Sequence, residues 1–265
     1  LLNFTVFTHA QQETQIIIGN KDSIYSNFLN EKRTIWVYTP NLTSPGNLPD
    51  QRYPVLYVLD GESHFVSTVG LVQQLSQVNG NAVPPEMIVV GITNTNRLRD
   101  LAPSLAAGSG YNNFIKFIET ELMPHIETDY KAAPYRVLIG HSLGGLTAID
   151  MLTNKPALFN ASIAIEPSMW YDNERILKNV IRQLPNSRLE NKRLFIGTAN
   201  TKPKGITLSA LTKDRTYGTQ HIRSIFKLDS FLKTKPNSGL MYAQKFYEND
   251  SHISVPLISA YDGLR

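Results

Sequence analysis

The residue of this chain with the clearest signal for catalysis is a serine that lies between two glycines. Residues 140–144 read Gly-His-Ser-Leu-Gly, so Ser142 is the centre of a Gly-x-Ser-x-Gly pattern. An apolar run, Val137–Ile139, precedes the pattern, and a stretch of helical character follows it, opening with a further glycine, Gly145. In a strand–turn–helix context this pattern places the serine hydroxyl above the end of a sheet, where it can act as a nucleophile. The flanking elements favour this interpretation over a chance match, and we predict that Ser142 attacks a carbonyl carbon.

The glycines of the pattern also have a steric reason to be there. Neighbouring backbone passes close to such a turn, so a side chain on Gly140 or Gly144 is expected to collide with it. The helix that follows begins with unpaired N–H groups and with the positive end of its dipole. We therefore expect the negative charge of a reacting oxygen to be stabilised at the start of this helix.

A serine hydroxyl is a weak nucleophile at its ordinary pKa and needs a base within hydrogen-bond reach. The chain has six histidines: His9, His64, His125, His141, His221 and His252. His252 follows the last expected strand, C-terminal to the serine, which is the order of nucleophile and base known for one large class of serine hydrolases. It is our predicted base, although an exposed turn histidine would have the same sequence context. The side chain of His141 is expected to point away from the exposed side of the turn.

The third member of a catalytic triad, an acid, is the least certain from the sequence. A triad needs a carboxylate that holds the imidazole in the correct tautomer, and we look for it after the strand Arg193–Gly197. Asp214 is the first carboxylate beyond that strand and is the predicted acid by position. Asp172 and Asp229 are alternatives, and an ordinary solvated role for Asp214 is equally compatible with the sequence. A Ser–His dyad without an acid also remains open.

Acyl transfer needs hydrogen-bond donors for the tetrahedral oxyanion. We predict the backbone N–H of Leu143, directly after the nucleophile, as one donor. The second is the N–H of Glu62, because Gly61 lets the chain after the strand Pro54–Leu59 approach the site closely. The alternative for Asp-Gly at this place is a simple turn signal.

Four further side chains are predicted to contact the substrate. Trp170 and Tyr171 would form an aromatic wall, with plain packing as the alternative. Arg97 would bind an anionic group, whereas the neighbouring Arg99 and Asp100 are interpreted as a structural ion pair. His64 follows the strand that ends near Asp60, so it is expected to line the pocket.

The elements that position these residues alternate along the chain. The segment from Gln15 to Pro40 predicts an antiparallel hairpin, with Ile16–Ile18 in its first strand. Further apolar runs predict buried parallel strands, with helical periods between them: Pro54–Leu59, Met87–Ile92, Arg136–Gly140, Ala161–Ile165, Arg193–Gly197 and Leu240–Tyr247. A helix is expected over Tyr111–Ile126, kinked or ended by Pro124. This pattern predicts one α/β domain, residues 1–265, with a mostly parallel central sheet covered by helices on both faces. In such sheets the ligand site lies at the carboxyl ends of the strands.

Composition excludes several other classes of protein. The chain has 265 residues, 42% of them hydrophobic, a formal charge of +4 and no cysteine. The absence of cysteine excludes disulfides and thiolate metal sites. Lysines and arginines are scattered rather than gathered into a stripe, so nucleic-acid binding is not expected. No apolar stretch is long enough to insert into a membrane.

The two ends of the sequence have features of their own. Leu1–Ala10 reads either as the remnant of a secretory signal peptide or as a first strand. The first interpretation predicts a periplasmic or secreted protein, and the second leaves a cytoplasmic one. Tyr261–Arg265 has the character of a helix still running, which suggests a longer native chain. The oligomeric state is not indicated.

From about Ile18 to Arg265 the sequence resembles the "putative esterase" family of α/β-hydrolases. The marks of this resemblance are Tyr57–Gly61, Asn94–Pro103, Glu121–Pro124, Ile139–Gly145, Pro167–Trp170 and Ser251–Pro256. The family includes esterase D (S-formylglutathione hydrolase), siderophore esterases, feruloyl esterases and mycolyltransferases, and the siderophore-esterase-like branch is the most similar. The resemblance implies that Ser142 is the nucleophile, that His252 is the base and that the N–H groups of Glu62 and Leu143 form the oxyanion hole. The sequence departs from the family pattern in two places. Glu166 stands where relatives often have a small residue, and no clear acid follows Gly197.

Together these features predict a serine hydrolase that cleaves small-molecule carboxylic esters through an acyl-enzyme on Ser142, with His252 as general base. We expect no metal ion or organic cofactor to be required. An acyltransferase on the same scaffold is the alternative among enzymes, and a catalytically silent binding protein is the alternative outside them. The identity of the ester is not determined by the sequence.

Overall fold

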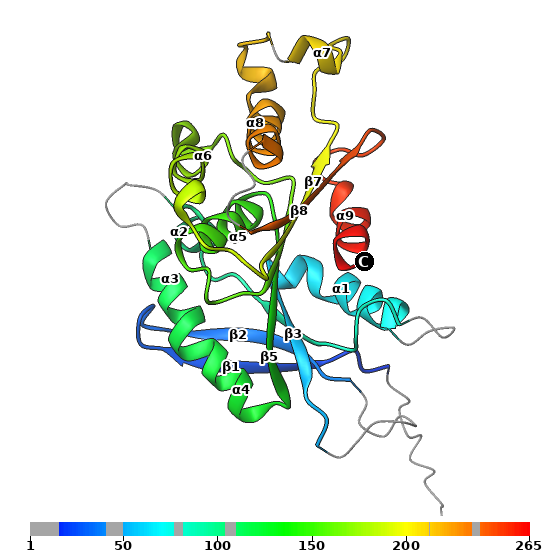
Figure 1. The fold of residues 1–265 in the computed structure, drawn as a ribbon. Coiled ribbons are helices and arrows are strands. Elements are labelled where there is room, and N and C mark those ends of the chain that lie inside the picture. The colour runs from blue at the N-terminus through cyan, green and yellow to red at the C-terminus, as the bar shows by residue number, and fades with distance from the viewer. Residues whose placement is uncertain (1–15, 41–49, 77–81, 104–109, 212, 235–238) are drawn as a thin grey trace, which may run out of the picture.

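A computed structural model (Figure 1) describes residues 16–40, 50–76, 82–103, 110–211, 213–234 and 239–265. The segment Leu1–Ala10, for which a signal-peptide remnant was predicted, lies outside the described residues.

Eight strands form one sheet in the order β1-β2-β4-β3-β5-β6-β7-β8. β1 and β2 pair antiparallel with each other, β2 pairs antiparallel with β4, and the strands from β3 to β8 are parallel. The bounds are β1 (Asn20–Ser26), β2 (Glu31–Tyr38), β3 (Tyr53–Leu59), β4 (Ile88–Ile92), β5 (Ala132–His141), β6 (Ala161–Ile165), β7 (Arg193–Ala199) and β8 (Met241–Tyr247). The expectation of a mostly parallel central sheet is confirmed.

Helices cover both faces of this sheet. α1 and α9 lie on one side, and α3, α4, α5, α6 and α8 lie on the other (Figure 1). The bounds are α1 (Gly61–Ser76), α2 (Arg97–Leu101), α3 (Tyr111–Phe117), α4 (Met123–Asp129), α5 (Leu143–Asn154), α6 (Tyr171–Gln183), α7 (Leu208–Leu211), α8 (Gln220–Thr234) and α9 (Val255–Leu264).

The central strands are apolar throughout because each face of the sheet has its own core. Along β3, Tyr57 and Leu59 belong to the core beneath α3 and α5, whereas Leu56 and Val58 belong to the core beneath α1 and α9. Successive side chains of a strand point to opposite faces, so a strand buried on both sides has no polar alternation.

Two expectations about local structure need correction. The first strand of the hairpin is Asn20–Ser26, and Ile16–Ile18 precede it, with Ile16 almost fully exposed. The helix expected over Tyr111–Ile126, kinked or ended by Pro124, does not end there. Instead, a π-helical turn over Ile118–Leu122 joins α3 to α4. A wider turn just before a proline accommodates the missing N–H and the bulk of its ring.

Within the described ranges, no helix is both long enough and apolar enough to span a bilayer.

Candidate active site

Ser142 lies in the turn between β5 and α5, as the sequence pattern predicts. Its backbone has a φ of 59° and a ψ of −114°, a conformation that costs a non-glycine residue about 1–3 kcal/mol. Two hydrogen bonds hold the turn: the Ser142 N–H donates to the carbonyl of Ile165 at 3.0 Å, and the N–H of Leu146 donates to the Ser142 carbonyl at 3.0 Å. The strained backbone presents the hydroxyl at the carboxyl end of the sheet.

Close backbone contacts explain two of the three glycines around this serine. A Cβ on Gly140 would overlap the carbonyl of Gly144, and a Cβ on Gly145 would lie 3.0 Å from the Ile165 carbonyl oxygen. At Gly144, however, the nearest atom would be Leu59 Cβ at 3.4 Å, which is an ordinary contact. The expected collision at Gly144 is therefore wrong, and Gly145 is the second position where the backbone excludes a side chain.

A cavity of about 340 Å³ opens beside the serine hydroxyl. It is lined by Ser142, Ser168, Trp170, Thr201, Tyr217, Gly218, Gln220, His221 and His252. Ser142, Ser168, Thr201 and His252 follow β5, β6, β7 and β8, so the cavity lies at the carboxyl ends of four neighbouring parallel strands. The structure thus brings Ser142, His252 and Trp170 together from distant parts of the sequence.

Ser168 is a site residue that sequence reasoning missed. Its Oγ lies 3.1 Å from Ser142 Oγ, and its N–H donates to the Ser142 carbonyl at 3.0 Å. The side chain is nearly fully buried. The sequence offered one signal for Ser168, because it lies in Pro167–Trp170, one of the segments that resemble the esterase family. In this structure the Ser142 hydroxyl is therefore held by a second hydroxyl.

His252 lies in the loop between β8 and α9 and is fixed through its backbone. His141 Nε2 donates to the His252 carbonyl at 2.9 Å, and the two rings have centroids 4.5 Å apart. The side chain of His141 therefore contacts His252, the predicted base, and the sequence did not predict this contact. Burial lowers the pKa of His252, the neighbouring His221 lowers it further, and Glu166 raises it. The imidazole is thus neutral at pH 7 and able to accept a proton.

The histidine beside the serine is also held neutral. Burial, together with the nearby His252 and His64, lowers the pKa of His141 to about 4. A neutral ring with its proton on Nε2 is the form that donates to the His252 carbonyl. His141 is therefore a hydrogen-bond donor that positions the loop of the predicted base.

Asp214 does not lie among the residues that line the cavity. Its carboxylate accepts hydrogen bonds from the Thr216 N–H at 2.6 Å, from Thr216 Oγ1 at 2.7 Å and from Thr219 Oγ1 at 2.8 Å. These bonds stabilise the turn that leads into α8, and they lower the pKa of Asp214. The two alternatives are also engaged locally, Asp172 with Arg175 and Asp229 with Tyr242 and Lys233.

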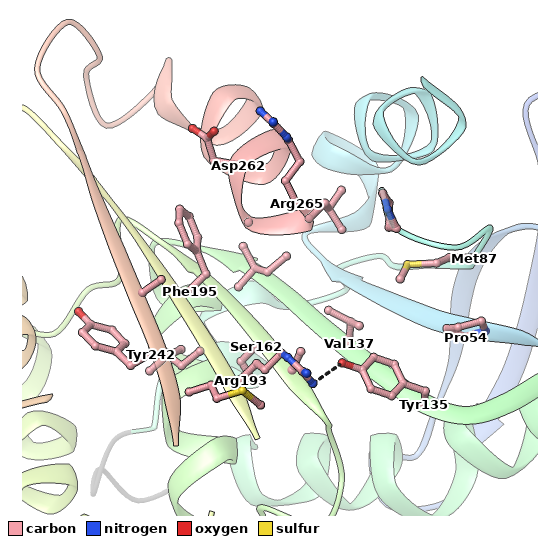
Figure 2. A pocket seen from close by; sticks show the side chains of 18 of the residues that line it. Pro54, Met87, Tyr135, Val137, Ser162, Arg193, Phe195, Tyr242, Asp262 and Arg265 are labelled. Carbon is pink, nitrogen blue, oxygen red and sulfur yellow. Dashed lines mark hydrogen bonds between the residues drawn. The ribbon is translucent and has the colours of Figure 1, made fainter. Parts of the chain in front are cut away.

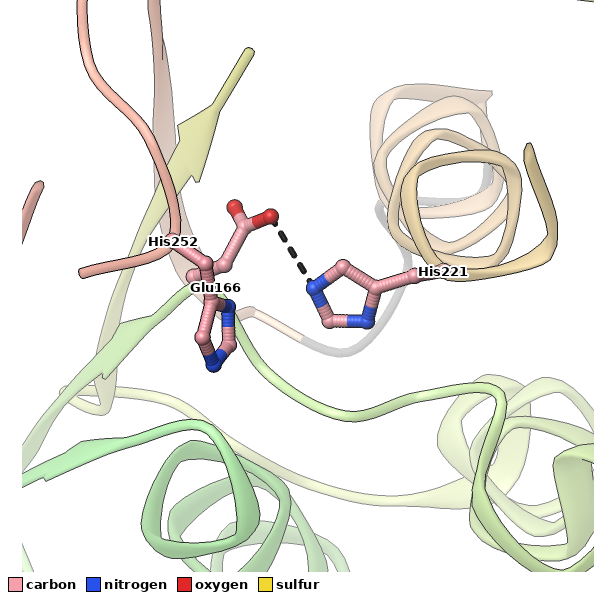
Figure 3. Close-up of side chains that lie close together, drawn as sticks. All are labelled: Glu166, His221 and His252. Carbon is pink, nitrogen blue, oxygen red and sulfur yellow. Dashed lines mark ion pairs between the residues drawn. The ribbon is translucent and has the colours of Figure 1, made fainter. Parts of the chain in front are cut away.

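A different carboxylate lies beside the predicted base. Glu166, directly after β6, is fully buried, and its Oε1 lies 2.9 Å from His221 Nε2. Figure 3 shows Glu166, His221 and His252 converging from three separate elements. One ligand atom from each of these side chains lies within 4.8 Å of the others. The structure therefore places Glu166, rather than Asp214, next to His252.

The two predicted oxyanion donors both lie in the first turn of a helix. Leu143 is the first residue of α5 and Glu62 is the second residue of α1, so their N–H groups belong to first helical turns, which have no intrahelical acceptor. The start of α1 is pressed against β4, because a Cβ on Gly61 would lie 2.6 Å from the backbone of Gly91. The Glu62 carboxylate accepts from the side chain of Asn94 at 2.7 Å. The role of these two N–H groups stays a prediction.

Three residues expected at the substrate lie outside the cavity lining. The guanidinium of Arg97 is bound by Asp60 through contacts of 2.6 and 2.9 Å. His64 packs edge-on against His141, with centroids 5.8 Å apart, and Tyr171 packs against the larger core.

The short helix α2, which begins with Arg97, is anchored by a second ion-pair network. Arg99 pairs with Asp100 at 2.6 Å, as predicted, and the buried Arg33 pairs with the same carboxylate at 2.5 Å.

Residues 26–209 match the model of a family described as "Putative esterase". This chain belongs to that family. The esterase is 31% identical to an IroE-like serine hydrolase from Shewanella oneidensis, with a TM-score of 0.80, over 93% of this chain and 78% of the other. It is 25% identical over 252 residues to ferri-bacillibactin esterase BesA of Bacillus subtilis, which covers 85% of this chain and 82% of BesA.

The fold of the esterase is shared with more distant proteins. The BES protein from Bacillus cereus is 24% identical and has a TM-score of 0.80 over 99% of this chain and 98% of its own. The sheet order, the helices on both faces and these relatives show an α/β-hydrolase fold. The family and its members show that the chain is a carboxylic ester hydrolase.

The esterase has a larger cavity at the opposite ends of its strands. It measures about 790 Å³, and its lining includes Pro54, Tyr135, Ala161 and Arg193 (Figure 2). These residues lie at or near the amino ends of β3, β5, β6 and β7. Neither Ser142 nor any histidine lines it. Chemistry rather than size therefore identifies the smaller cavity as the candidate active site.

The turn at Ser142 predicts a sharp contrast between two glycine variants. Gly140→Ala should lower the free energy of unfolding by about 2–3 kcal/mol, because its Cβ would overlap the backbone of the turn. The matched control is Gly70→Ala on the exposed side of α1, where nothing lies within 4 Å. That variant should be neutral or stabilised by up to about 1 kcal/mol. Urea unfolding measures both, and equal effects would contradict the account.

Buried histidines predict a loss of stability on acidification. Burial lowers the pKa values of His141, His64 and His252 below 6.5, so the unfolded chain takes up protons that the folded chain refuses. The free energy of unfolding should fall as the pH drops from 7 to 5. His141→Gln keeps an amide donor but does not titrate, so urea unfolding at the two pH values should show a smaller fall for this variant. If the free energy of unfolding of this variant fell as much as that of the parent, His141 would not contribute to the acid sensitivity.

Proposed function

We propose that Ser142 is the nucleophile and His252 the general base of this esterase. The observation that carries the proposal is that a strained serine at the end of β5 shares a cavity with a neutral histidine from the loop after β8. Ser142 Oγ attacks the ester carbonyl carbon while its proton passes to a ring nitrogen of His252. For this step the hydroxyl leaves Ser168 Oγ and turns toward His252, which lines the same cavity.

The same histidine serves both halves of the reaction. The imidazolium returns its proton to the alkoxide as the carbon–oxygen bond of the ester breaks, which leaves an acyl group on Ser142. A water molecule then attacks the acyl carbon and gives its proton to His252. The acid is released as the proton returns to Ser142 Oγ. Each proton that His252 takes up is returned within the cycle, and none of the steps needs an oxidant or a metal.

Charge on the tetrahedral oxygen would be stabilised at the starts of two helices. The N–H groups of Leu143 and Glu62 lie in the first turns of α5 and α1, where the helix dipole also favours a negative charge. Such preorganised donors usually account for a large part of catalysis in acyl transfer.

For the substrate we propose the ester bonds of a siderophore or a similar aryl-bearing ester. Support comes from the relative named ferri-bacillibactin esterase, matched over most of both chains. It also comes from the cavity lining, in which Trp170 and Tyr217 offer aromatic surface to an aryl group. A panel of siderophore lactones, feruloyl sugars, short acyl esters and thioesters tests this choice. We expect the highest kcat/KM for a siderophore ester, and a preference of tenfold or more for short acyl thioesters would refute it.

Removing either group should abolish hydrolysis. Ser142→Ala and His252→Ala should each lower kcat for a p-nitrophenyl ester by at least about a thousandfold, because each removes one partner of the proton transfer. The matched control is His125→Ala, a histidine that pairs with Asp22 and Asp129 at the other end of the molecule. It should keep kcat within about twofold. Activity of Ser142→Ala within tenfold of the parent would refute the assignment.

Chelators should leave the reaction unaffected. The side chains of Glu166, His221 and His252 lie close enough together for a metal ion to be considered. The mechanism above requires His252 to be free as a base, so dialysis against EDTA should leave kcat unchanged and added Zn²⁺ should inhibit or have no effect. Loss of activity in EDTA that returns with a metal ion would contradict the proposed mechanism.

A further inference from the structure

A fully buried carboxylate at the end of β6 has a role that the sequence did not reveal. Glu166 has no exposed surface, although a buried charge is costly unless it is paired and hydrogen-bonded. Its partners satisfy that requirement. Oε2 accepts from the Ala199 N–H at 2.5 Å, Oε1 accepts from Thr201 Oγ1 at 3.0 Å, and Oε1 also faces His221 Nε2 at 2.9 Å.

The partners of Glu166 place its carboxylate at the end of the neighbouring strand. Ala199 is the last residue of β7, and Thr201 follows it. This is where a triad acid was sought and where the loop offers no carboxylate of its own. Glu166 reaches that place from β6, and its N–H donates to the carbonyl of Gly197 in β7 at 2.7 Å.

The backbone at Glu166 is held in a conformation that a simple packing residue would not need. Its φ is 43°, in the left-handed region, where a residue with a side chain is strained. Such strain persists when the surroundings fix it, and it gathers at functional sites. Here the conformation directs a long acidic side chain across β7 toward the histidines (Figure 3).

Two imidazoles complete the cluster. The ring of His221, at the start of α8, lies 5.3 Å from the ring of His252, centroid to centroid, and the planes are nearly perpendicular. His252 Nδ1 is buried and has no hydrogen-bond partner in the structure. One atom from each of Glu166, His221 and His252 lies within 4.8 Å of the other two. The carboxylate therefore lies close to the imidazole of His252, which has one ring nitrogen without a partner.

We propose that Glu166 is the acid of this active site, a positioning residue that orients and electrostatically supports His252, with His221 packed against both side chains. The inference rests on the proposed roles of Ser142 and His252. The acid thus comes from the end of β6, and Asp214 has no part in catalysis. No step of the reaction transfers a proton to Glu166.

The physical effect is strongest when His252 carries a proton. The imidazolium that forms as Ser142 loses its proton lies next to a buried negative charge, where screening by water is weak. The two neighbours of His252 act in opposite directions on its pKa: Glu166 raises it and His221 lowers it.

The test compares two variants by the pH dependence of kcat/KM for a p-nitrophenyl ester. Glu166→Gln should lower kcat by a hundredfold or more with little change in KM, and it should move the acid limb of the profile to lower pH. His221→Gln should move that limb to higher pH. Asp214→Asn is the matched control and should keep kcat within about twofold and the limb unmoved. Circular dichroism and urea unfolding establish that each variant is folded.

Several outcomes would overturn the inference. A folded Glu166→Gln enzyme with kcat within tenfold of the parent, or with an unmoved acid limb, contradicts it. If Glu166→Gln does not fold, His221→Gln decides, and no shift of its limb also contradicts the inference. An inactive Ser142→Ala enzyme beside an active Glu166→Gln enzyme would refute this inference alone, whereas an active Ser142→Ala enzyme would refute the proposed function itself.

Discussion

The turn between β5 and α5 is the constraint on which the site depends. Ser142 keeps a backbone conformation that is unfavourable for a residue with a side chain, and it does so because the surrounding backbone leaves no alternative. The Ile165 carbonyl accepts its N–H, and the close approach of residues 140 and 144 requires glycine at position 140. Strain of about 1–3 kcal/mol is a substantial fraction of the stability of a typical domain. The packing of a sheet that is buried on both faces offsets this cost.

The same sheet gathers the side chains that surround Ser142. Parallel strands end at one edge, so the loops after β5, β6, β7 and β8 meet although they are spread over more than a hundred residues of sequence. The environment there is dry enough to keep His141 and His252 neutral, and it holds one buried carboxylate, Glu166, among hydrogen-bond donors. Burial therefore keeps the predicted base neutral, and it weakens the screening of a charge on the proposed acid.

Periodicity and motif context were sufficient to predict the sheet, the turn at Ser142 and the position of His252 after the last strand. They failed where a residue acts across strands. Asp214 was chosen because it follows β7 in sequence, whereas the place beside β7 is filled by Glu166 from β6. Ser168 and the contact of His141 with His252 were missed for the same reason, because hydrogen bonds between loops leave no periodic signal. The polar edge strand Asn20–Ser26 was misplaced because the more apolar Ile16–Ile18 precedes it.

The central claim is that one hydroxyl and one imidazole, remote in sequence, act as a unit at the cavity described above. The most direct measurement is the rate at which a fluorophosphonate probe labels the protein, with the labelled residue identified by mass spectrometry. The account predicts a single adduct on Ser142 and labelling that slows by at least about a hundredfold in His252→Ala, because the probe requires an activated hydroxyl. An adduct on Ser168, or labelling of Ser142 at an equal rate without His252, would contradict it.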